Sequence, residues 1–221
     1  IVFIDLKKEL NQIYDEYAHK ARKNIKKAER SGLKIICSNS KDDFEKFITV
    51  YLLSMKEKKA NQFYHFNEKF FSKFFTIFPK NLQIFRVEYD GKTIAATVVL
   101  GKYGILHDYL RGSLKEYLSL RPNDFMIDEI IKYAKENGYN YYSLGGGSSI
   151  NPDDPIFNFK KSFSSTTKKF YTYKKIHNLE KYKELCSFSG LNTKELVYEQ
   201  ASFFPEYSKP QTNNSISTHK K

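Results

Sequence analysis

The stretch Ser143–Phe163 reads S-L-G-G-G-S-S-I-N-P-D-D-P-I-F-N-F-K-K-S-F and links a predicted strand to a predicted helix. The strand pattern covers Tyr139–Leu144 and stops at three consecutive glycines. Glycine has no Cβ, so the backbone at Gly145, Gly146 and Gly147 can adopt positive φ and lie close to a ligand. The order of strand, glycine turn and helix therefore predicts a place where a ligand meets the backbone.

The second half of this stretch is typical of a helix start. Asp153 and Asp154 come just before a proline, and acidic residues and proline are favoured in a first helical turn. We predict a short helix over Pro155–Phe163 that carries Phe159 and Lys160. A lysine beside a glycine turn can bind and polarise an acyl group. The alternative, which the chemistry alone favours, is a simple turn followed by a solvated surface lysine.

Composition indicates a globular protein with anionic partners. The chain has 221 residues, of which 40% are hydrophobic and 16% aromatic, and its net charge is +12. Such a charge favours nucleic acid, a membrane surface or a phosphorylated substrate, although a generally lysine-rich composition explains the average equally well. The two cysteines lie far apart and the five histidines do not cluster. We therefore expect reduced thiols in a cytoplasmic protein, with no metal site and no bound cofactor.

One long amphipathic helix is predicted over Asp5–Ser31, because apolar residues recur at helical spacing and Gly32 follows as a natural stop. The opposite face of its second half is strongly basic. That face either is simply solvated or meets phosphates. Its basic residues are Lys20, Arg22, Lys23, Lys26, Lys27 and Arg30.

The remaining pattern predicts an α/β (α+β) fold with a mixed, mostly antiparallel central sheet flanked by helices. Asp90-Gly91 predicts a tight hairpin. The phenylalanine stripe of the helix predicted over Asn67–Phe78 is interpreted as core. Predicted strands are Leu33–Cys37, Leu82–Tyr89, Lys92–Leu100, Ile105–Arg111, Tyr139–Leu144 and Lys168–Ile176. Predicted helices are Lys41–Lys58, Asn67–Phe78, Leu120–Asn137, Pro155–Phe163, Leu179–Leu185 and Lys194–Phe204. We expect one domain over residues 1–178, a helical appendage over 179–204 and a disordered tail over 205–221.

Four motifs in this order resemble the GNAT acyltransferase fold and, more narrowly, its FemAB-type branch of peptidoglycan interpeptide-bridge transferases. They are the basic run Arg22–Ala28 with Ser31-Gly32-Leu33, then Tyr109–Ser113, Leu144–Gly147, and Phe159-Lys160 with Phe163. The resemblance implies transfer of an acyl or aminoacyl group onto an amine. In the bridge-forming members the donor is aminoacyl-tRNA and the acceptor is a peptidoglycan precursor that carries a diphosphate.

The resemblance also implies residue roles. Lys160 matches the lysine near the donor's ester carbonyl, where it would stabilise the oxyanion of the tetrahedral intermediate. Phe159 would help to wall that site. The implied substrate-binding residues are Arg22, Asn24, Lys26, Tyr109, Arg111, Gly145, Gly146 and Gly147.

Two departures from the family leave alternatives open. The bridge-forming enzymes usually have two such domains, whereas this chain has the length of one. The Gln/Arg-x-x-Gly-x-Gly/Ala loop that holds the CoA pyrophosphate in typical members is absent from Arg111–Asn123. No general base stands out, since His107 and Asp108 are interpreted as structural, and the amine would lose its proton to the substrate or to water.

The leading hypothesis is thus an aminoacyltransferase or acyltransferase that acts on an anionic cell-wall precursor. It would be cytoplasmic, with peripheral contact to the inner membrane face as a further option. One alternative is an acyl-CoA-dependent N-acyltransferase of amino sugars in surface polysaccharide synthesis. Another is a non-catalytic basic domain that binds nucleic acid or anionic lipid.

Overall fold

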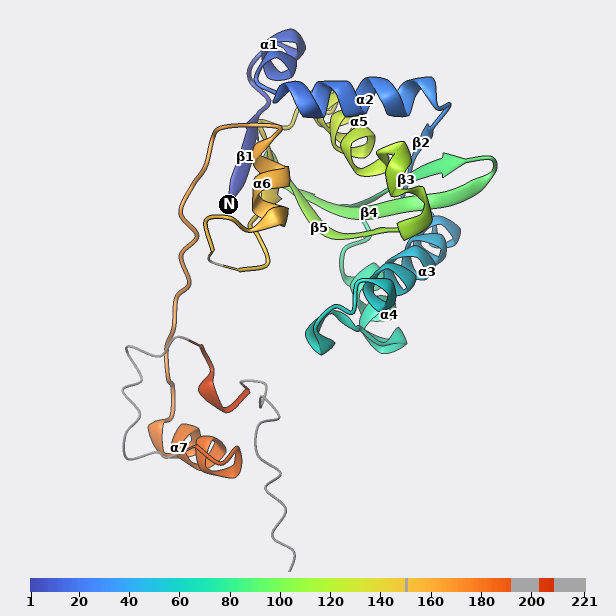
Figure 1. The fold of residues 1–221 in the computed structure, drawn as a ribbon. Coiled ribbons are helices and arrows are strands. Elements are labelled where there is room, and N and C mark those ends of the chain that lie inside the picture. The colour runs from blue at the N-terminus through green and yellow to red at the C-terminus, as the bar shows by residue number, and fades with distance from the viewer. Residues whose placement is uncertain (150, 192–202, 209–221) are drawn as a thin grey trace, which may run out of the picture. The chain divides into compact units, whose positions relative to one another are not determined.

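The computed structural model describes residues 1–149, 151–191 and 203–208 (Figure 1). The chain divides into two compact units, Ile1–Lys169 and Phe170–Lys221, which are described separately. The first unit contains the whole sheet and all the predicted site residues.

A six-stranded sheet forms the centre of the first unit, with the strand order β1-β6-β5-β4-β3-β2. The strands are β1 (Val2–Asp5), β2 (Lys34–Ser38), β3 (Leu82–Tyr89), β4 (Lys92–Lys102), β5 (Ile105–Ser113) and β6 (Tyr141–Gly145). Neighbouring strands are antiparallel except β5 and β6, which run parallel. This confirms the predicted mixed, mostly antiparallel sheet.

Helices cover both faces of the sheet, with α2 and α5 on one face and α3 and α4 on the other (Figure 1). The helices are α1 (Leu10–Asp15), α2 (His19–Arg30), α3 (Lys41–Glu57), α4 (Glu68–Ile77), α5 (Pro122–Glu136) and α6 (Pro155–Lys161). Successive strand residues point to opposite faces, so Val99 joins the core under α2 and α5 while Val98 joins the core under α3 and α4. Phe71 and Phe74 are buried in the second core, as the phenylalanine stripe predicted.

The β3–β4 hairpin closes where the sequence predicted. Tyr89 pairs with Lys92, so Asp90 and Gly91 form a two-residue loop. Both loop residues have positive φ, of 47° and 73°. This conformation matches the right-handed twist of the flanking strands.

The single long helix predicted over Asp5–Ser31 is wrong, because the chain turns between α1 and α2. Tyr17 lies in that turn and is buried. Its hydroxyl donates to Asp128 Oδ1 over 3.1 Å, and its ring lies 5.2 Å from the Phe163 ring. Local periodicity runs through the break, so only these contacts with distant parts of the chain reveal it.

Both ends of the sheet prediction also needed correction. The strand β1 was missed, although its residues are mostly apolar and it pairs with β6 along one edge. The strand predicted over Lys168–Ile176 does not form. An isolated bridge between Val2 and Thr167 is the nearest pairing. The place beside β6 belongs to β1, and the later segment touches only the outer side of β1, through that bridge and the backbone hydrogen bonds of Thr166 and Lys168.

In the second unit, the structure describes α7 (Leu179–Phe188) and the short 3-10 helix η3 (Glu206–Ser208). The Tyr182 ring of α7 stacks on Phe204 with centroids 5.9 Å apart. The helix predicted over Leu179–Leu185 is thereby confirmed.

Other expectations for this end of the chain lie largely outside the described residues. These are most of the helix predicted over Lys194–Phe204 and all but residues 205–208 of the predicted disordered tail. The expected boundaries after residues 178 and 204 stay predictions. Within the described part of the chain, no helix combines the length and apolar character needed to cross a membrane.

Candidate active site

The site lies where the two parallel strands part. The strands β5 and β6 pair at only three positions, and His107 opposite Ser143 is the last of them. Beyond it, β5 continues along β4 to Ser113, whereas β6 ends at Gly145. The glycine run therefore begins just after the last residue pair that joins the two strands.

Two of the three glycines are required by the geometry. Gly145 has φ of +75°, in the left-handed region that side chains disfavour. At Gly147 an added Cβ would stand 2.4 Å from Asp154 Oδ1, which is closer than a Cβ approaches a non-bonded atom in real proteins. Gly146 contributes its carbonyl oxygen, which faces Lys160.

Asp154 holds this loop against α6. Its Oδ1 accepts the Phe157 N–H over 2.8 Å and caps the helix. Its Oδ2 accepts the backbone N–H groups of Ser148 and Ser149, each over 3.0 Å, and also their hydroxyls. These hydrogen bonds, led by that of the Ser148 hydroxyl, hold the pKa of Asp154 far below its usual range. The predicted helix start is confirmed, but no sequence pattern indicates that the capping residue also holds the glycine loop.

Lys160 points into the site. Its Nζ donates to the Gly146 carbonyl oxygen over 2.7 Å, and no ion pair with Lys160 occurs among the described residues. Burial, assisted by the nearby Arg111 charge, lowers the pKa of Lys160, while the Asp108 and Asp154 carboxylates oppose that shift. An ammonium has three N–H groups, so two remain to meet a substrate oxygen.

The space above Gly145, where a side chain would begin, lies between the side chains of Lys160 and His107. The position that a Cβ would occupy there is 3.5 Å from Lys160 Nζ and 3.9 Å from His107 Cε1. A small reacting group placed over this glycine could therefore contact both side chains.

Arg111 is engaged inside the protein. Its Nη2 donates to Asp108 Oδ2 over 2.5 Å and approaches the Tyr142 hydroxyl at 3.4 Å. The other Asp108 oxygen accepts the Thr97 hydroxyl over 2.7 Å. Arg111 Nε is buried and lacks a hydrogen-bond partner within the described residues. The sequence reasoning missed this pairing with Asp108, which holds the Arg111 guanidinium inside the protein.

Two aromatic residues predicted for the site lie at its sides. Tyr109 is 41% exposed and stacks on Phe74 of α4, with ring centroids 5.1 Å apart and planes at 9°. Phe159 is half-buried and meets Phe163 edge-on at 5.5 Å. Phe159 therefore anchors α6 to the core next to Lys160, and its predicted role as a wall of the site stays a prediction.

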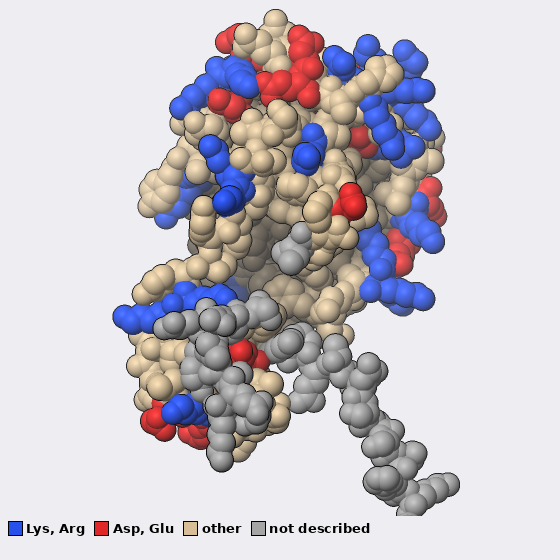
Figure 2. Space-filling view, turned by 60° about the vertical axis from the view of Figure 1, so that its left-hand side comes forward, with Lys and Arg blue, Asp and Glu red and all other residues tan. Residues whose placement is uncertain are grey.

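The basic residues predicted to bind substrate, Arg22 and Lys26, lie on α2. Neither of them takes part in the hydrogen bond that Lys160 makes with Gly146. Lys26 is exposed, and the partly exposed Arg22 approaches Asp15 at 3.9 Å. The Asn24 amide instead donates to the buried Asp124 carboxylate of α5 over 3.0 Å. Lys and Arg side chains crowd the upper right of the face shown in Figure 2. The Asn24–Asp124 hydrogen bond thus joins α2 to α5.

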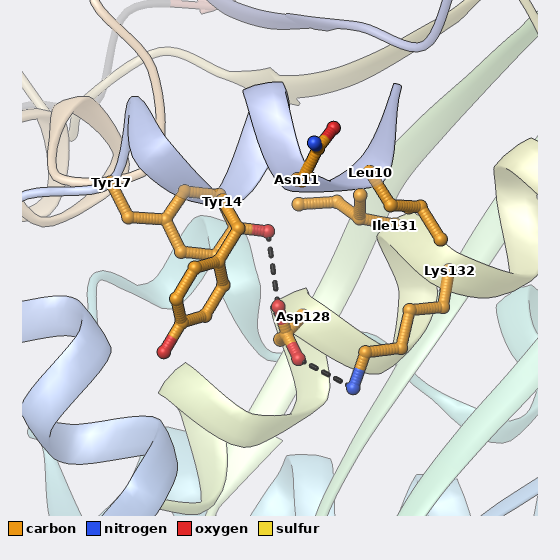
Figure 3. Close-up of a pocket in the computed structure, with 7 residues that line it drawn as sticks. All are labelled: Leu10, Asn11, Tyr14, Tyr17, Asp128, Ile131 and Lys132. Atoms are coloured by element: carbon orange, nitrogen blue, oxygen red, sulfur yellow. Dashed lines mark hydrogen bonds and ion pairs between the residues drawn. The ribbon is translucent and has the colours of Figure 1, made fainter. Parts of the chain in front are cut away.

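A separate cavity of about 250 Å³ lies between α1 and α5 (Figure 3). It is lined by Leu10, Asn11, Tyr14, Tyr17, Asp128, Ile131 and Lys132. Asp128 accepts from the Tyr17 hydroxyl and pairs with Lys132 Nζ at 2.7 Å. No predicted site residue lines this cavity, and its charged groups are paired with one another.

The residues that could bind metal are scattered in the described part of the chain. No group of three or more His, Cys, Asp or Glu side chains there could hold an ion. Cys37 is exposed and Cys186 is buried, and each is a free thiol. The site therefore offers an ammonium, an imidazole and backbone groups as its chemical equipment.

Comparison with known proteins supplies the family. Residues 16–161 match the family described as the acetyltransferase (GNAT) domain, and this match includes every predicted site residue. A relative from Weissella viridescens, UDP-N-acetylmuramoylpentapeptide-lysine N(6)-alanyltransferase, is 27% identical over 174 residues. That alignment covers 77% of this chain but only 51% of the relative, so the chain spans about half of the relative's length.

Solved structures show the same fold. FemX superposes with a TM-score of 0.62 at 11% identity, covering 73% of this chain and 57% of FemX. The C-terminal domain of a putative lysylphosphatidylglycerol synthetase from Agrobacterium fabrum superposes with a TM-score of 0.55 at 15% identity, covering 73% of this chain and 55% of that one. Together with the family match, the parted β5 and β6 strands and the six-stranded sheet lead to one conclusion: this chain belongs to the acetyltransferase (GNAT) domain family.

Proposed function

We propose that this domain transfers an aminoacyl group from an aminoacyl-tRNA onto an amine of a peptidoglycan precursor. The observation that carries the proposal is the Lys160 ammonium, held at the glycine loop with two N–H groups available. When an amine attacks an ester carbonyl, the carbonyl oxygen becomes negative. A cation already in place stabilises that charge, and one such donor contributes about 10²–10³ in kcat.

The environment of Lys160 supports this role. Partial burial strengthens the attraction between an ammonium and a developing oxyanion. The Gly146 carbonyl restrains the side chain, so little reorganisation is needed at the moment of reaction. Gly145 leaves room for the carbonyl beside Nζ. The tetrahedral intermediate then collapses, the amide forms and the ester oxygen leaves with a proton.

The choice of acceptor follows from charge and from the similar protein. The name of the Weissella viridescens relative gives the acceptor amine as a lysine N6 of a muramoylpentapeptide nucleotide. A phosphorylated acceptor of that kind suits the exposed basic side chains on α2. We therefore place acceptor binding on Arg22 and Lys26, in a cytoplasmic protein that meets the inner membrane face peripherally.

The donor is the less constrained part of the proposal. The segment before α5 forms the 3-10 helix η2 (Lys115–Leu120), and Arg121 follows it with φ of 63°. A glycine-rich turn that presents successive backbone N–H groups to a pyrophosphate is missing from this segment, which disfavours CoA. The acetyltransferase description of the family nevertheless keeps an acyl-CoA-dependent N-acyltransferase as the second candidate.

One experiment separates the two candidates. The protein is incubated with a pool of charged tRNAs or with a pool of acyl-CoAs, and UDP-MurNAc-pentapeptide or an amino sugar is added as the acceptor. Mass spectrometry then reads the mass gained by the acceptor. We expect an aminoacyl mass on the pentapeptide from the tRNA pool. An acyl mass that appears only with CoA donors would replace the proposal by the second candidate. No transfer from either pool would favour the non-catalytic alternative.

A further inference from the structure

His107 stands on the opposite side of the Gly145 space from Lys160. It comes from β5 and is the last residue of that strand to pair with β6. Its Nδ1 lies 3.1 Å from the Ser143 hydroxyl oxygen. Its Nε2 makes no hydrogen bond to any described residue, and its Cε1 lies 3.9 Å from the position that a Gly145 Cβ would occupy. One ring nitrogen is thus held by the protein and the other is free near the reacting position.

The groups around His107 favour the neutral form of its imidazole. Burial is the main cause that lowers its pKa below the ordinary 6.5, and the Lys160 charge adds to that effect. The neighbouring Asp108 carboxylate opposes the shift, but it already accepts from Arg111 and Thr97. The Tyr109 ring, 6.4 Å from the imidazole, brings no charge.

Other proton acceptors near Lys160 are already engaged. Asp108 is bound by Arg111 and Thr97, and Asp154 accepts five hydrogen bonds from the loop and helix. Tyr142 is fully buried, which raises the pKa of its phenol well above 10. Among the described groups that surround the Gly145 space, His107 is the one with an unshared electron pair available.

We propose that His107 is the general base of the transfer reaction, with its Nδ1–H donating to the Ser143 hydroxyl and its Nε2 taking a proton from the acceptor. This inference rests on the proposed function. The acceptor arrives as an ammonium, and Nε2 removes one proton so that a free amine can attack the ester carbonyl. As the intermediate collapses, the C–O bond breaks and the nitrogen loses a second proton to the departing oxygen. The imidazolium then returns its proton to water. Lys160 thus stabilises the oxyanion, and His107 deprotonates the acceptor amine.

The first test is the pH dependence of kcat/KM, measured from about pH 5 to about pH 8 with alanyl-tRNA and UDP-MurNAc-pentapeptide. The wild type is expected to gain activity as the pH rises through a midpoint below 6.5 and then to level off. His107→Asn keeps a nitrogen near Ser143 but lacks the base, so we expect kcat/KM to fall by about 10²–10⁴ and the acidic limb to vanish. Free imidazole should restore part of the activity of His107→Ala. His65→Asn, at an exposed histidine that contacts Ala60, is the control. A His107→Asn enzyme with wild-type kcat/KM and an unchanged pH profile would overturn the proposal.

A second test needs no turnover, so it separates this inference from the proposed function. Nuclear magnetic resonance follows the His107 imidazole in the wild type and in Lys160→Met. We expect the Nδ1–H tautomer, a titration midpoint below 6.5, and a higher midpoint once the Lys160 charge is removed. An Nε2–H tautomer, or a titration midpoint that is the same in Lys160→Met as in the wild type, would refute the role of His107. This result would hold even if the wild type transferred no aminoacyl group to the probe acceptor.

Discussion

At the scale of single residues, the central feature is the absence of a side chain at Gly145. Gly145 combines positive φ with a space that Lys160 Nζ and His107 Cε1 border. Neither property can be read from three glycines in a row, because the sequence does not reveal which glycine takes the left-handed conformation. The spacing of Phe159 and Lys160 did predict a helix lysine near the turn, and the structure places it there.

Gly145→Ala should therefore damage activity more than stability. The substitution costs about 1–2 kcal/mol for the left-handed backbone, and the new methyl group fills the space where the carbonyl would sit. Gly138→Ala is a matched control, since Gly138 has φ of +73° but nothing within 4 Å of its added Cβ. Denaturant unfolding should show similar losses in both variants, whereas kcat should fall only in Gly145→Ala. Equal kcat values in the two variants would place the reacting group elsewhere.

Asn24 presents a choice between a binding role and a structural one. Its amide donates to Asp124. Burial raises the pKa of Asp124 above its ordinary value, and the hydrogen bond from Asn24 opposes part of that rise. Asn24→Ala leaves a buried carboxyl without that donor, so we expect about 1–3 kcal/mol of lost unfolding free energy. Lys23→Ala, at the exposed neighbour, should change little. An Asn24→Ala protein with unchanged unfolding but weaker acceptor binding would support the substrate-binding role that the resemblance implied.

The loss in Asn24→Ala should depend on pH in a defined direction. A carboxyl whose folded pKa lies above its unfolded pKa favours folding at low pH, and this contribution disappears as the pH rises through the folded pKa. Removal of the Asn24 donor raises the pKa of Asp124 further. The destabilisation should therefore be small in acid, where Asp124 is protonated, and largest near neutral pH.

At the scale of elements, the helix α6 and the glycine loop act as one unit because Asp154 bonds to both. Asp154→Ala should free the loop and displace the Gly146 carbonyl that orients Lys160, and a misplacement of about 1 Å can cost about 10²-fold in rate. Asp153→Ala is the control, since Asp153 is the exposed neighbour. Equal kcat values for the two variants would show that the loop holds its shape without Asp154.

The low pKa of Asp154 gives this prediction a pH signature. A carboxyl whose pKa falls on folding stabilises the fold above its unfolded pKa, and that stabilisation is lost as the pH drops through the folded value. Thermal unfolding should show the gap between wild type and Asp154→Ala at neutral pH, and the gap should close in strong acid. A gap that persists in acid would mean that the cap acts through packing instead.

The elements also show how far local pattern carries a prediction. Alternation of apolar and polar residues predicts strands β3, β4 and β5, and turn chemistry predicts the Asp90-Gly91 hairpin. Helical spacing of apolar residues predicts α3, α4 and α5. The split between α1 and α2 depends on Tyr17 reaching Asp128, a contact far away in sequence. The partner of β6 at the sheet edge also depends on contacts far apart in sequence, since β1 takes that place and the later segment reaches only the outer side of β1 at Thr167.

At the scale of the whole molecule, the site draws on segments separated along the chain. Strand β5 supplies His107, the end of β6 supplies the glycines and α6 supplies Lys160, while the basic side chains belong to α2. Because the chain spans about half of the Weissella viridescens relative, acceptor binding by this unit needs its own measurement.

The charge on α2 should govern acceptor affinity. Arg22→Ala combined with Lys26→Ala removes two positive charges from that helix, and we expect weaker binding of UDP-MurNAc-pentapeptide, with the larger loss at low salt. Lys69→Ala with Lys73→Ala removes the same charge from exposed positions on α4 and is the control. Isothermal titration calorimetry at two salt concentrations measures the acceptor affinity of each variant. A loss that salt does not alter, or one shared by the control, would argue against phosphate recognition by α2.

The most direct test of oxyanion stabilisation by Lys160 compares two adjacent lysines on α6. Lys160 points at the Gly146 carbonyl, whereas Lys161 is exposed and lies over the Phe157 ring. Single-turnover transfer from alanyl-tRNA to UDP-MurNAc-pentapeptide is measured for Lys160→Ala and Lys161→Ala, with circular dichroism to confirm that both are folded. We expect a loss of about 10²-fold to about 10³-fold for Lys160→Ala and near wild-type turnover for Lys161→Ala. A folded Lys160→Ala protein that turns over as fast as Lys161→Ala would contradict the claim that this ammonium stabilises the oxyanion.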